Sequence, residues 1–78
     1  MSKVTIYTTQ TCQFCKMAKM YFKDNNVEYI EKDVTTNAAL QQEMIEKSGQ
    51  MGVPVIIVGD QVVVGFDKPR LQELITAV

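Results

Sequence analysis

The sequence predicts an α/β fold in which a mixed four-stranded sheet is flanked by three helices, in the order βαβαββα. Residues 3–8 alternate polar and apolar side chains, which is the period of a strand. Apolar residues then recur at helical spacing, and two β-branched runs follow later around a Gly-Asp link. The 78 residues, 46% hydrophobic and 22% charged, suit a single globular domain over residues 1–78.

The first half of the chain predicts a strand–helix–strand unit, whose crossover is right-handed in nearly all known cases. After the strand at residues 3–8, a helix is expected to begin at Phe14, with Thr11 as its N-cap. Its inward-facing positions, spaced i, i+3, i+4, i+7 and i+8, are Phe14, Met17, Ala18, Tyr21 and Phe22. The helix is expected to end at residues 24–26. Residues 27–34 read as the next strand, and their charged side chains suit an edge of the sheet.

A second helix is expected over residues 37–47. Thr35 or Thr36 is its predicted N-cap, and Ser48-Gly49 gives a C-terminal stop. The residues predicted to face the core are Leu40, Met44 and Ile45.

Two β-branched runs complete the predicted sheet. Residues 53–58 are apolar on both faces, which is typical of a central strand covered by helices on both sides. Gly59-Asp60 separates this run from residues 61–64 and predicts a hairpin. Asp67 is expected to cap the last helix, with Pro69 in its first turn. The inner face of that helix comprises Leu71, Leu74, Ile75 and Val78.

Composition excludes several classes of partner. A net charge of -1 without a basic block argues against nucleic acid or an anionic membrane. The longest apolar run, residues 53–58, is far shorter than the roughly 20 residues of a membrane span. The alternating start of the chain lacks the apolar centre of a signal peptide, so we expect a cytoplasmic protein.

The residue types present also limit the chemistry. The chain has no histidine, which excludes Ser-His-Asp and Cys-His constellations and histidine-ligated zinc. Two cysteines cannot complete a four-thiolate metal site within one chain. No metal and no bound cofactor are expected. Cys12 and Cys15 are therefore the candidates for covalent chemistry.

The C-x-x-C motif at Cys12 and Cys15 lies where the first strand leads into the first helix. Backbone N–H groups in the first turn of a helix are unpaired and carry a partial positive charge. The sulfur of Cys12 can accept hydrogen bonds from the amides of Phe14 and Cys15, which favours the nucleophilic thiolate. Lys16 and Lys19 add positive charge nearby. Cys12, the outer thiol, would attack a substrate disulfide, and Cys15 would resolve the mixed disulfide.

Other interpretations of the two cysteines stay open on the sequence alone. They could form half of a zinc or iron–sulfur site completed by a second chain, a structural disulfide, or a pair of buried thiols. A disulfide closing so short a loop confers little chain-entropy stabilisation. The strand–turn–helix context favours the redox site.

Two further segments stand out. Val53-Pro54 begins the central run, where a proline marks a strand end or an exposed backbone edge. The functional interpretation is a cis-proline loop that presents the backbone of Val53 to a ligand; the simpler one is a strand-start proline. Asp67 is first a helix cap, at a helix start that could also receive a ligand carboxylate.

Met17, Met44 and Met51 are expected to fill gaps in the core, although Met51 could instead contact partners.

Taken together, the residues resemble the glutaredoxins and, more broadly, the thioredoxin-fold dithiol proteins. The resemblance covers the whole chain and depends on the order and spacing of three segments, namely residues 4–15, 52–55 and 64–67. It implies a thioredoxin-like fold of glutaredoxin type, a cis bond before Pro54, and reduction of protein disulfides or glutathione mixed disulfides. Beyond the two cysteines, the contacts it implies for substrate or glutathione are Gln13, Phe14, Val53, Pro54, Gly65, Phe66 and Asp67.

The sequence also departs from the usual glutaredoxin pattern. Gln13 and Phe14 replace the proline and tyrosine of Cys-Pro-Tyr-Cys, and Thr9 stands where many members have a glutathione-binding lysine. Some family members without that proline hold an iron–sulfur cluster between two chains. Residues 65–69 resemble the Gly-Phe-x-Pro stretch of redoxins that thioredoxin reductase reduces. The expected partners are disulfide-bearing proteins, with glutathione as co-substrate or thioredoxin reductase as electron donor, and we expect a monomer.

Overall fold

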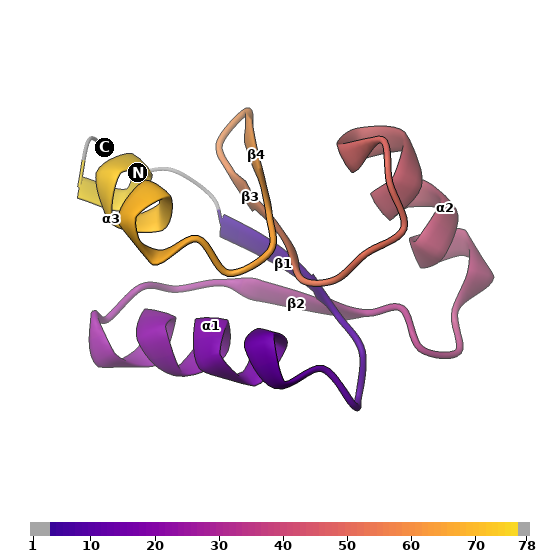
Figure 1. Ribbon diagram of the computed structural model, residues 1–78, viewed down its shortest axis with the longest axis horizontal. Helices are drawn as coiled ribbons and strands as arrows, with labels where there is room; N and C mark the ends of the chain where they lie inside the picture. The colour runs from indigo at the N-terminus through magenta and orange to yellow at the C-terminus, as the bar shows by residue number, and fades with distance from the viewer. Residues whose placement is uncertain (1–3, 77–78) are drawn as a thin grey trace.

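The computed structural model describes residues 4–76 and confirms the predicted α/β class and element order. Three helices and four strands alternate as the sequence predicts (Figure 1). Their bounds are β1 (Val4–Thr8), α1 (Gln13–Asp24), β2 (Ile30–Asp33), α2 (Ala38–Ser48), β3 (Val55–Val58), β4 (Gln61–Val64) and α3 (Lys68–Thr76).

The four strands form one mixed sheet in the order β2-β1-β3-β4. β1 pairs in parallel with β2 and antiparallel with β3, which in turn pairs antiparallel with β4. β2 lies at an edge, as its charged side chains predict. It is shorter than the predicted residues 27–34, because the amide of Val27 still bonds to the carbonyl of Phe22, 2.8 Å away, as the chain leaves α1.

The sheet has a hydrophobic cluster on each face. On one face, α1 and α3 cover alternate residues of the strands; this cluster contains Val4, Ile6, Ala18, Phe22, Ile56, Val58, Val63 and Leu71. On the other face, α2 covers a smaller cluster of Tyr7, Val34, Met44 and Val55. Figure 1 shows α1 and α3 together on one side of the strands and α2 on the other.

α1 turns a different set of residues inward from the predicted one. Its buried residues are Cys15, Ala18 and Phe22, whereas Phe14 and Met17 are 60% and 48% exposed. The prediction that Phe14 and Met17 lie in the inner stripe is therefore wrong. The buried positions start at Cys15 and are spaced i, i+3 and i+7, so they lie on one face of the helix.

The N-cap of α2 is Asn37, not Thr35 or Thr36. The side chain of Asn37 accepts a hydrogen bond from the amide of Leu40 at 3.0 Å. Thr35 is engaged elsewhere, since its amide donates to Asp33 and its hydroxyl accepts from the amide of Gln10. The predicted glycine stop is confirmed, because Gly49 is the C-cap with φ of 75°.

The C-terminal half otherwise follows the predictions, with one shift. β3 begins at Val55 rather than 53, because Pro54 has no amide proton to donate to a neighbouring strand. The bond between Val53 and Pro54 is cis, as the resemblance implies. The Gly59-Asp60 hairpin is confirmed. Asp67 caps α3, accepting a hydrogen bond from the amide of Arg70 at 3.3 Å. Val78 lies outside the described residues.

Two predictions about methionines have opposite outcomes. Met44 is buried in the core beneath α2, as expected. Met51 is 72% exposed in the loop before β3, so it does not fill a core gap.

Candidate functional site

The predicted site residues come from three connecting segments at the same end of the sheet, namely the one before α1, the one before β3 and the one after β4. β1 and β3 are antiparallel with Tyr7 opposite Val55, so the end of one strand lies beside the start of the other. Val55 also lies opposite Val64, which brings the end of β4 to the same place. All the residues predicted to form the site lie in these segments or in the first turn of α1.

Cys12 and Cys15 stand at the start of α1 with different exposure. Cys12, rather than the predicted Thr11, is the N-cap. Its Sγ accepts a hydrogen bond from the amide of Cys15 at 3.1 Å, and among the described residues no other amide, including that of Phe14, makes this contact. Donation from a backbone amide stabilises negative charge on the sulfur. Cys12 is partly exposed, whereas Cys15 is only 1% exposed, and neither is in a disulfide.

The two thiols differ in their electrostatic surroundings. Burial, followed by the hydrogen bond to Cys12, raises the pKa of the Cys15 thiol to about 12, while a backbone hydrogen bond at Thr9 acts in the opposite direction. Cys15 therefore carries its proton at neutral pH and donates toward the sulfur of Cys12. This arrangement pairs an accessible sulfur with a protonated thiol behind it.

A polar network behind Cys15 was not visible in the sequence. Lys19 lies one turn after Cys15 on α1, and its charge lowers the pKa of that thiol. Lys19 is held by Glu31 of β2 at 2.9 Å, and the same carboxylate oxygen accepts a hydrogen bond from the buried hydroxyl of Thr8 at 2.8 Å. Glu31 is twelve or more residues from both partners, so the pairing of β1 with β2 and the packing of α1 against the sheet bring the three together. The positive charge expected from Lys19 is thus partly neutralised, while Lys16 is exposed.

Pro54 and Gly65 are brought together behind the cysteine segment. The amide of Gly65 donates to the carbonyl of Pro54 at 2.8 Å. Gly65 has φ of 82°, a conformation that favours glycine. Val53 is half-buried and precedes the cis bond, and Pro54 is buried. The backbone at Val53 and the turn at Gly65 therefore lie next to each other, at the end of the sheet where β1 leads toward the cysteines.

Phe66 and Asp67 make different contacts. The ring of Phe66 packs edge-on against Tyr21 of α1, with ring centroids 6.1 Å apart, and joins the core cluster under α3. Asp67 is exposed and its carboxylate caps α3. Gln13 is exposed at the first position of α1.

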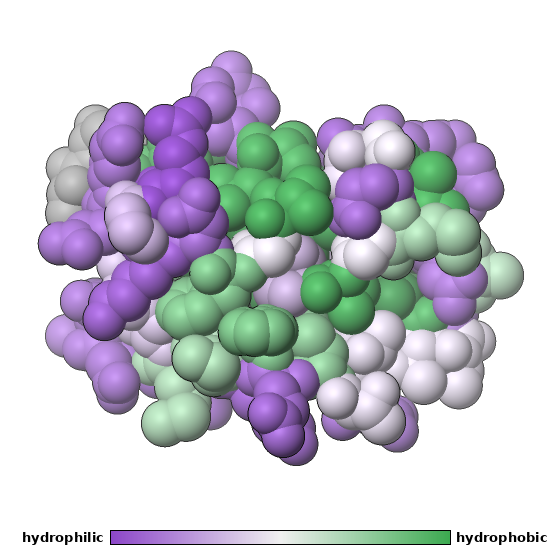
Figure 2. All heavy atoms as spheres, in the orientation of Figure 1, coloured by the Kyte–Doolittle hydropathy of each residue, from purple (hydrophilic) through white to green (hydrophobic). Residues whose placement is uncertain are grey.

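Apolar side chains surround the cysteine segment on the surface. Phe14, Met17 and Met20 form an exposed row along α1, and Met51 is exposed in the loop before Val53. Figure 2 shows apolar atoms over α1 and over the β3–β4 hairpin on one face of the molecule. An exposed patch of this kind next to a reactive group is typical of a contact surface for partners.

Neither a metal site nor a membrane span is found among residues 4–76. No group of three or more His, Cys, Asp or Glu side chains is placed to hold a metal ion there. A metal site shared between two chains, the alternative that the sequence left open, has no supporting observation in this part of the chain. No helix in the described range is both long and apolar enough to cross a bilayer.

Comparison with known proteins gives a consistent result. The sequence model of the Glutaredoxin family matches residues 4–63. An uncharacterized glutaredoxin-like 8.6 kDa protein in the rubredoxin operon of Clostridium pasteurianum is 38% identical over 72 residues, covering 92% of this chain and 96% of that protein. Glutaredoxin 3 of Escherichia coli strain K12 is 39% identical over 67 residues, covering 86% of this chain and 81% of the relative.

A solved structure extends the comparison to the fold. The glutaredoxin-like protein NrdH-redoxin from Escherichia coli superposes with a TM-score of 0.78 at 25% identity, covering 92% of this chain and 93% of that one. The thioredoxin-like architecture that the resemblance implies is thereby confirmed. The family match spans most of the chain and includes both cysteines, so this chain belongs to the glutaredoxin family.

Proposed function

We propose that the protein is a thiol–disulfide oxidoreductase that reduces disulfides through a cycle of Cys12 and Cys15. The observation that carries the proposal is the pairing of a partly exposed Cys12 sulfur, which accepts the Cys15 amide, with a buried and protonated Cys15 thiol. Membership of the glutaredoxin family supports the same chemistry.

The cycle balances as two thiol–disulfide exchanges. The thiolate of Cys12 attacks one sulfur of the substrate disulfide; a bond forms between the two sulfurs, and the second substrate sulfur leaves as a thiolate. Cys15 then loses its proton and attacks Cys12, which forms the Cys12–Cys15 disulfide and releases the remaining substrate sulfur. The substrate gains two electrons, and the protein loses them.

The surroundings of Cys12 favour protein disulfides and glutathione mixed disulfides as substrates. The exposed row of Phe14, Met17 and Met20 offers apolar contact area to a polypeptide. The backbone at Val53 can pair with an extended peptide or with glutathione, because Val53 precedes β3 and lies outside the strand pairing of the sheet.

The oxidised protein requires a two-electron donor. Two molecules of glutathione supply the electrons if Val53 and Asp67 bind it, despite Thr9 in place of the usual lysine. A thioredoxin reductase would supply them if residues 65–69 act as in the redoxins that they resemble. The Escherichia coli NrdH-redoxin is described as a glutaredoxin-like protein with a thioredoxin-like activity profile, which supports the second donor. We propose thioredoxin reductase as the donor, a monomer as the acting unit and the cytoplasm as its location, where thiols are kept reduced.

Single-cysteine variants test the cycle. With a model protein disulfide as substrate, Cys12→Ser is expected to reduce the rate to the uncatalysed background. Cys15→Ser is expected to form a covalent adduct with the substrate, visible as an increase in mass. Circular dichroism of both variants controls for folding. A folded Cys12→Ser protein with normal turnover would contradict the proposal.

The donor is tested by the rate at which oxidised protein regains two thiols. One reaction contains reduced glutathione alone, and the other contains NADPH with thioredoxin reductase. Recovery that requires the reductase is the expected result. Fast recovery with glutathione alone would replace the proposed donor and would leave the dithiol cycle intact.

A further inference from the structure

A concave site lies on the face of the sheet that carries α2. The pocket has a volume of about 160 Å³ and is lined by Thr5, Tyr7, Lys32, Lys47, Ile57 and Gly59. Pockets for drug-sized ligands hold roughly 300–1,000 Å³, so this one suits a small group.

The pocket is on the opposite face from α1 and its cysteines. Along β1, Ile6 belongs to the cluster beneath α1 and α3, whereas Tyr7 belongs to the cluster beneath α2. Side chains alternate along a strand, so Thr5 shares the face of Tyr7. A ligand in this pocket therefore does not occupy the surface that Cys12 presents to a disulfide.

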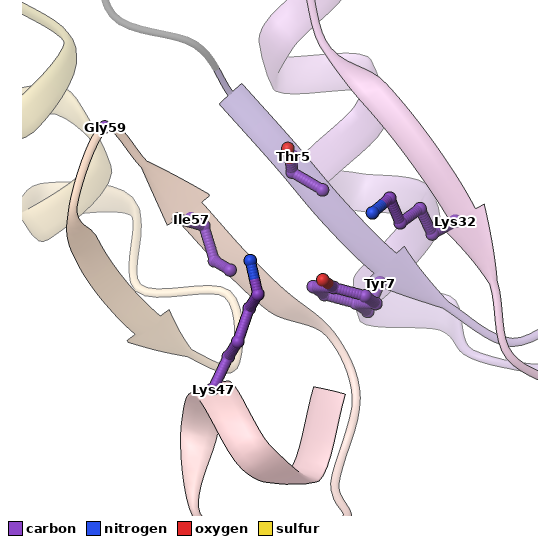
Figure 3. A pocket seen from close by; sticks show the side chains of 6 residues that line it. All are labelled: Thr5, Tyr7, Lys32, Lys47, Ile57 and Gly59. Carbon is purple, nitrogen blue, oxygen red and sulfur yellow. The ribbon is translucent and has the colours of Figure 1, made fainter. Parts of the chain in front are cut away.

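Two lysine side chains from different elements converge on the pocket. Lys32 comes from the edge strand β2, and Lys47 comes from the last turn of α2. Figure 3 shows them extending from opposite sides toward the space beside Thr5, Tyr7 and Ile57. Two ammonium groups around one small hollow raise the local potential for anions.

The Glu43 carboxylate is hydrogen-bonded to two of the residues that line the pocket. Glu43 accepts hydrogen bonds from Tyr7 and, at 2.7 Å, from the ammonium of Lys32, so its charge is already paired. Burial, followed by the hydrogen bond to Glu43, raises the pKa of the Tyr7 phenol, which therefore stays uncharged. The Lys32 ammonium also lies 5.6 Å from the centre of the Tyr7 ring, which fixes its position.

Lys47 is the cation that remains available. Among the described residues it has no ion pair within 4 Å, and it acts on Glu43 only at longer range. The pocket thus holds two lysine charges against one carboxylate that Lys32 already neutralises. The charged residues among the six that line the pocket are both lysines.

We propose that this pocket is a second ligand site, separate from the cysteines, that binds a small phosphate group. Lysine ammonium groups are compact point charges that bind phosphate oxygens, and the Thr5 hydroxyl supplies a neutral donor beside them. The Lys47 ammonium supplies the unpaired charge, and phosphate has enough oxygens to accept from Lys47, Lys32 and Thr5 together, which a carboxylate with two oxygens does not. The bound group is either free phosphate or the phosphate of a small ester.

The site is tested by titrating ¹⁵N-labelled reduced protein with inorganic phosphate and, separately, with glycerol phosphate. Chloride keeps the ionic strength constant in both series. The amide signals of Tyr7, Ile57 and Gly59 are expected to shift along saturating curves. Tighter binding of inorganic phosphate would identify free phosphate as the ligand, and tighter binding of glycerol phosphate would identify an ester.

A matched pair of variants distinguishes a specific binding site from nonspecific electrostatic attraction. Lys47→Gln removes the available ammonium and is expected to weaken phosphate binding tenfold or more. Lys23→Gln removes an exposed lysine from the last turn of α1, the corresponding position of another helix, and should leave binding unchanged. Shifts that do not saturate, or equal binding by the two variants, would overturn the proposal.

Discussion

The buried position of Cys15 predicts a large difference in reactivity between the two thiols. The chain has two cysteines, so Cys12→Ser and Cys15→Ser each leave a single thiol whose reaction rate can be measured. In Cys12→Ser the remaining thiol keeps the burial that is the largest cause of its raised pKa. We expect it to react much more slowly in the folded than in the unfolded protein.

The magnitude is worked from the pKa of about 12 for Cys15 in the wild-type chain, to which burial contributes more than Cys12 does. At pH 8 a thiol with a pKa of about 8.5 is roughly one quarter ionised, whereas one with this pKa is ionised to about 1 part in 10⁴. The thiolate fraction is therefore about 2 × 10³ lower in the folded state. A more basic thiolate is intrinsically a better nucleophile, and with a Brønsted coefficient of 0.4–0.5 this returns roughly 25- to 50-fold. The net slowing is roughly 50- to 100-fold, to which blocked access adds.

The assay follows release of the coloured thiol from an aromatic disulfide such as Ellman's reagent. Cys12→Ser is measured folded and in concentrated guanidinium chloride, and Cys15→Ser provides the exposed thiol for comparison. The folded Cys12→Ser protein should react at least 50-fold more slowly than the same chain unfolded. A folded rate within tenfold of the unfolded one would refute both the burial of Cys15 and its role as the protonated thiol.

Two further predictions concern stability. Phe22 is fully buried beneath α1, so Phe22→Ala should lower the free energy of unfolding by about 3–5 kcal/mol in denaturant titration, whereas Phe14→Ala at an exposed site should change it by about 0.5 kcal/mol or less; equal losses would contradict the observed face of α1. Reduced protein should also lose stability as the pH rises above about 8.5, because the unfolded chain then releases the Cys15 proton that the folded one retains. From pH 8 to pH 10 the loss should be about 2 kcal/mol greater than in Cys15→Ala, and parallel pH curves for the two proteins would contradict the raised pKa.

The order of elements and the cysteine pair were predictable because each depends on local sequence. Alternation, helical spacing and the Gly59-Asp60 link act over a few residues, and the structure confirms them. The cap of the last helix at Asp67 was equally predictable, since its side chain bonds to an amide three residues away.

The predictions were wrong where tertiary packing or competing hydrogen-bond partners determine the helix cap or the buried face of a helix. Thr11 and Thr35 are good N-cap residues by type, but the caps are Cys12 and Asn37. The exposure of Phe14 depends on how α1 is rotated over the sheet, and the sequence period alone does not determine that rotation.

Contacts between residues far apart in the chain could not be predicted from the sequence. Glu43 meets Tyr7 across a separation of 36 residues, and Glu31 meets Thr8 across 23. Both contacts depend on which strands pair and which helix covers each face, so the sequence alone does not predict them. The lysine-lined pocket was missed for the same reason.

The central claim, that Cys12 and Cys15 together transfer two electrons, is tested most directly by a single turnover. Fully reduced protein is mixed with an equimolar model disulfide, quenched with acid and examined by mass spectrometry and peptide mapping. The account predicts a wild-type product with an internal Cys12–Cys15 disulfide and one equivalent of fully reduced substrate. Wild-type protein that keeps both thiols free, or that stays joined to the substrate through Cys12, would contradict it.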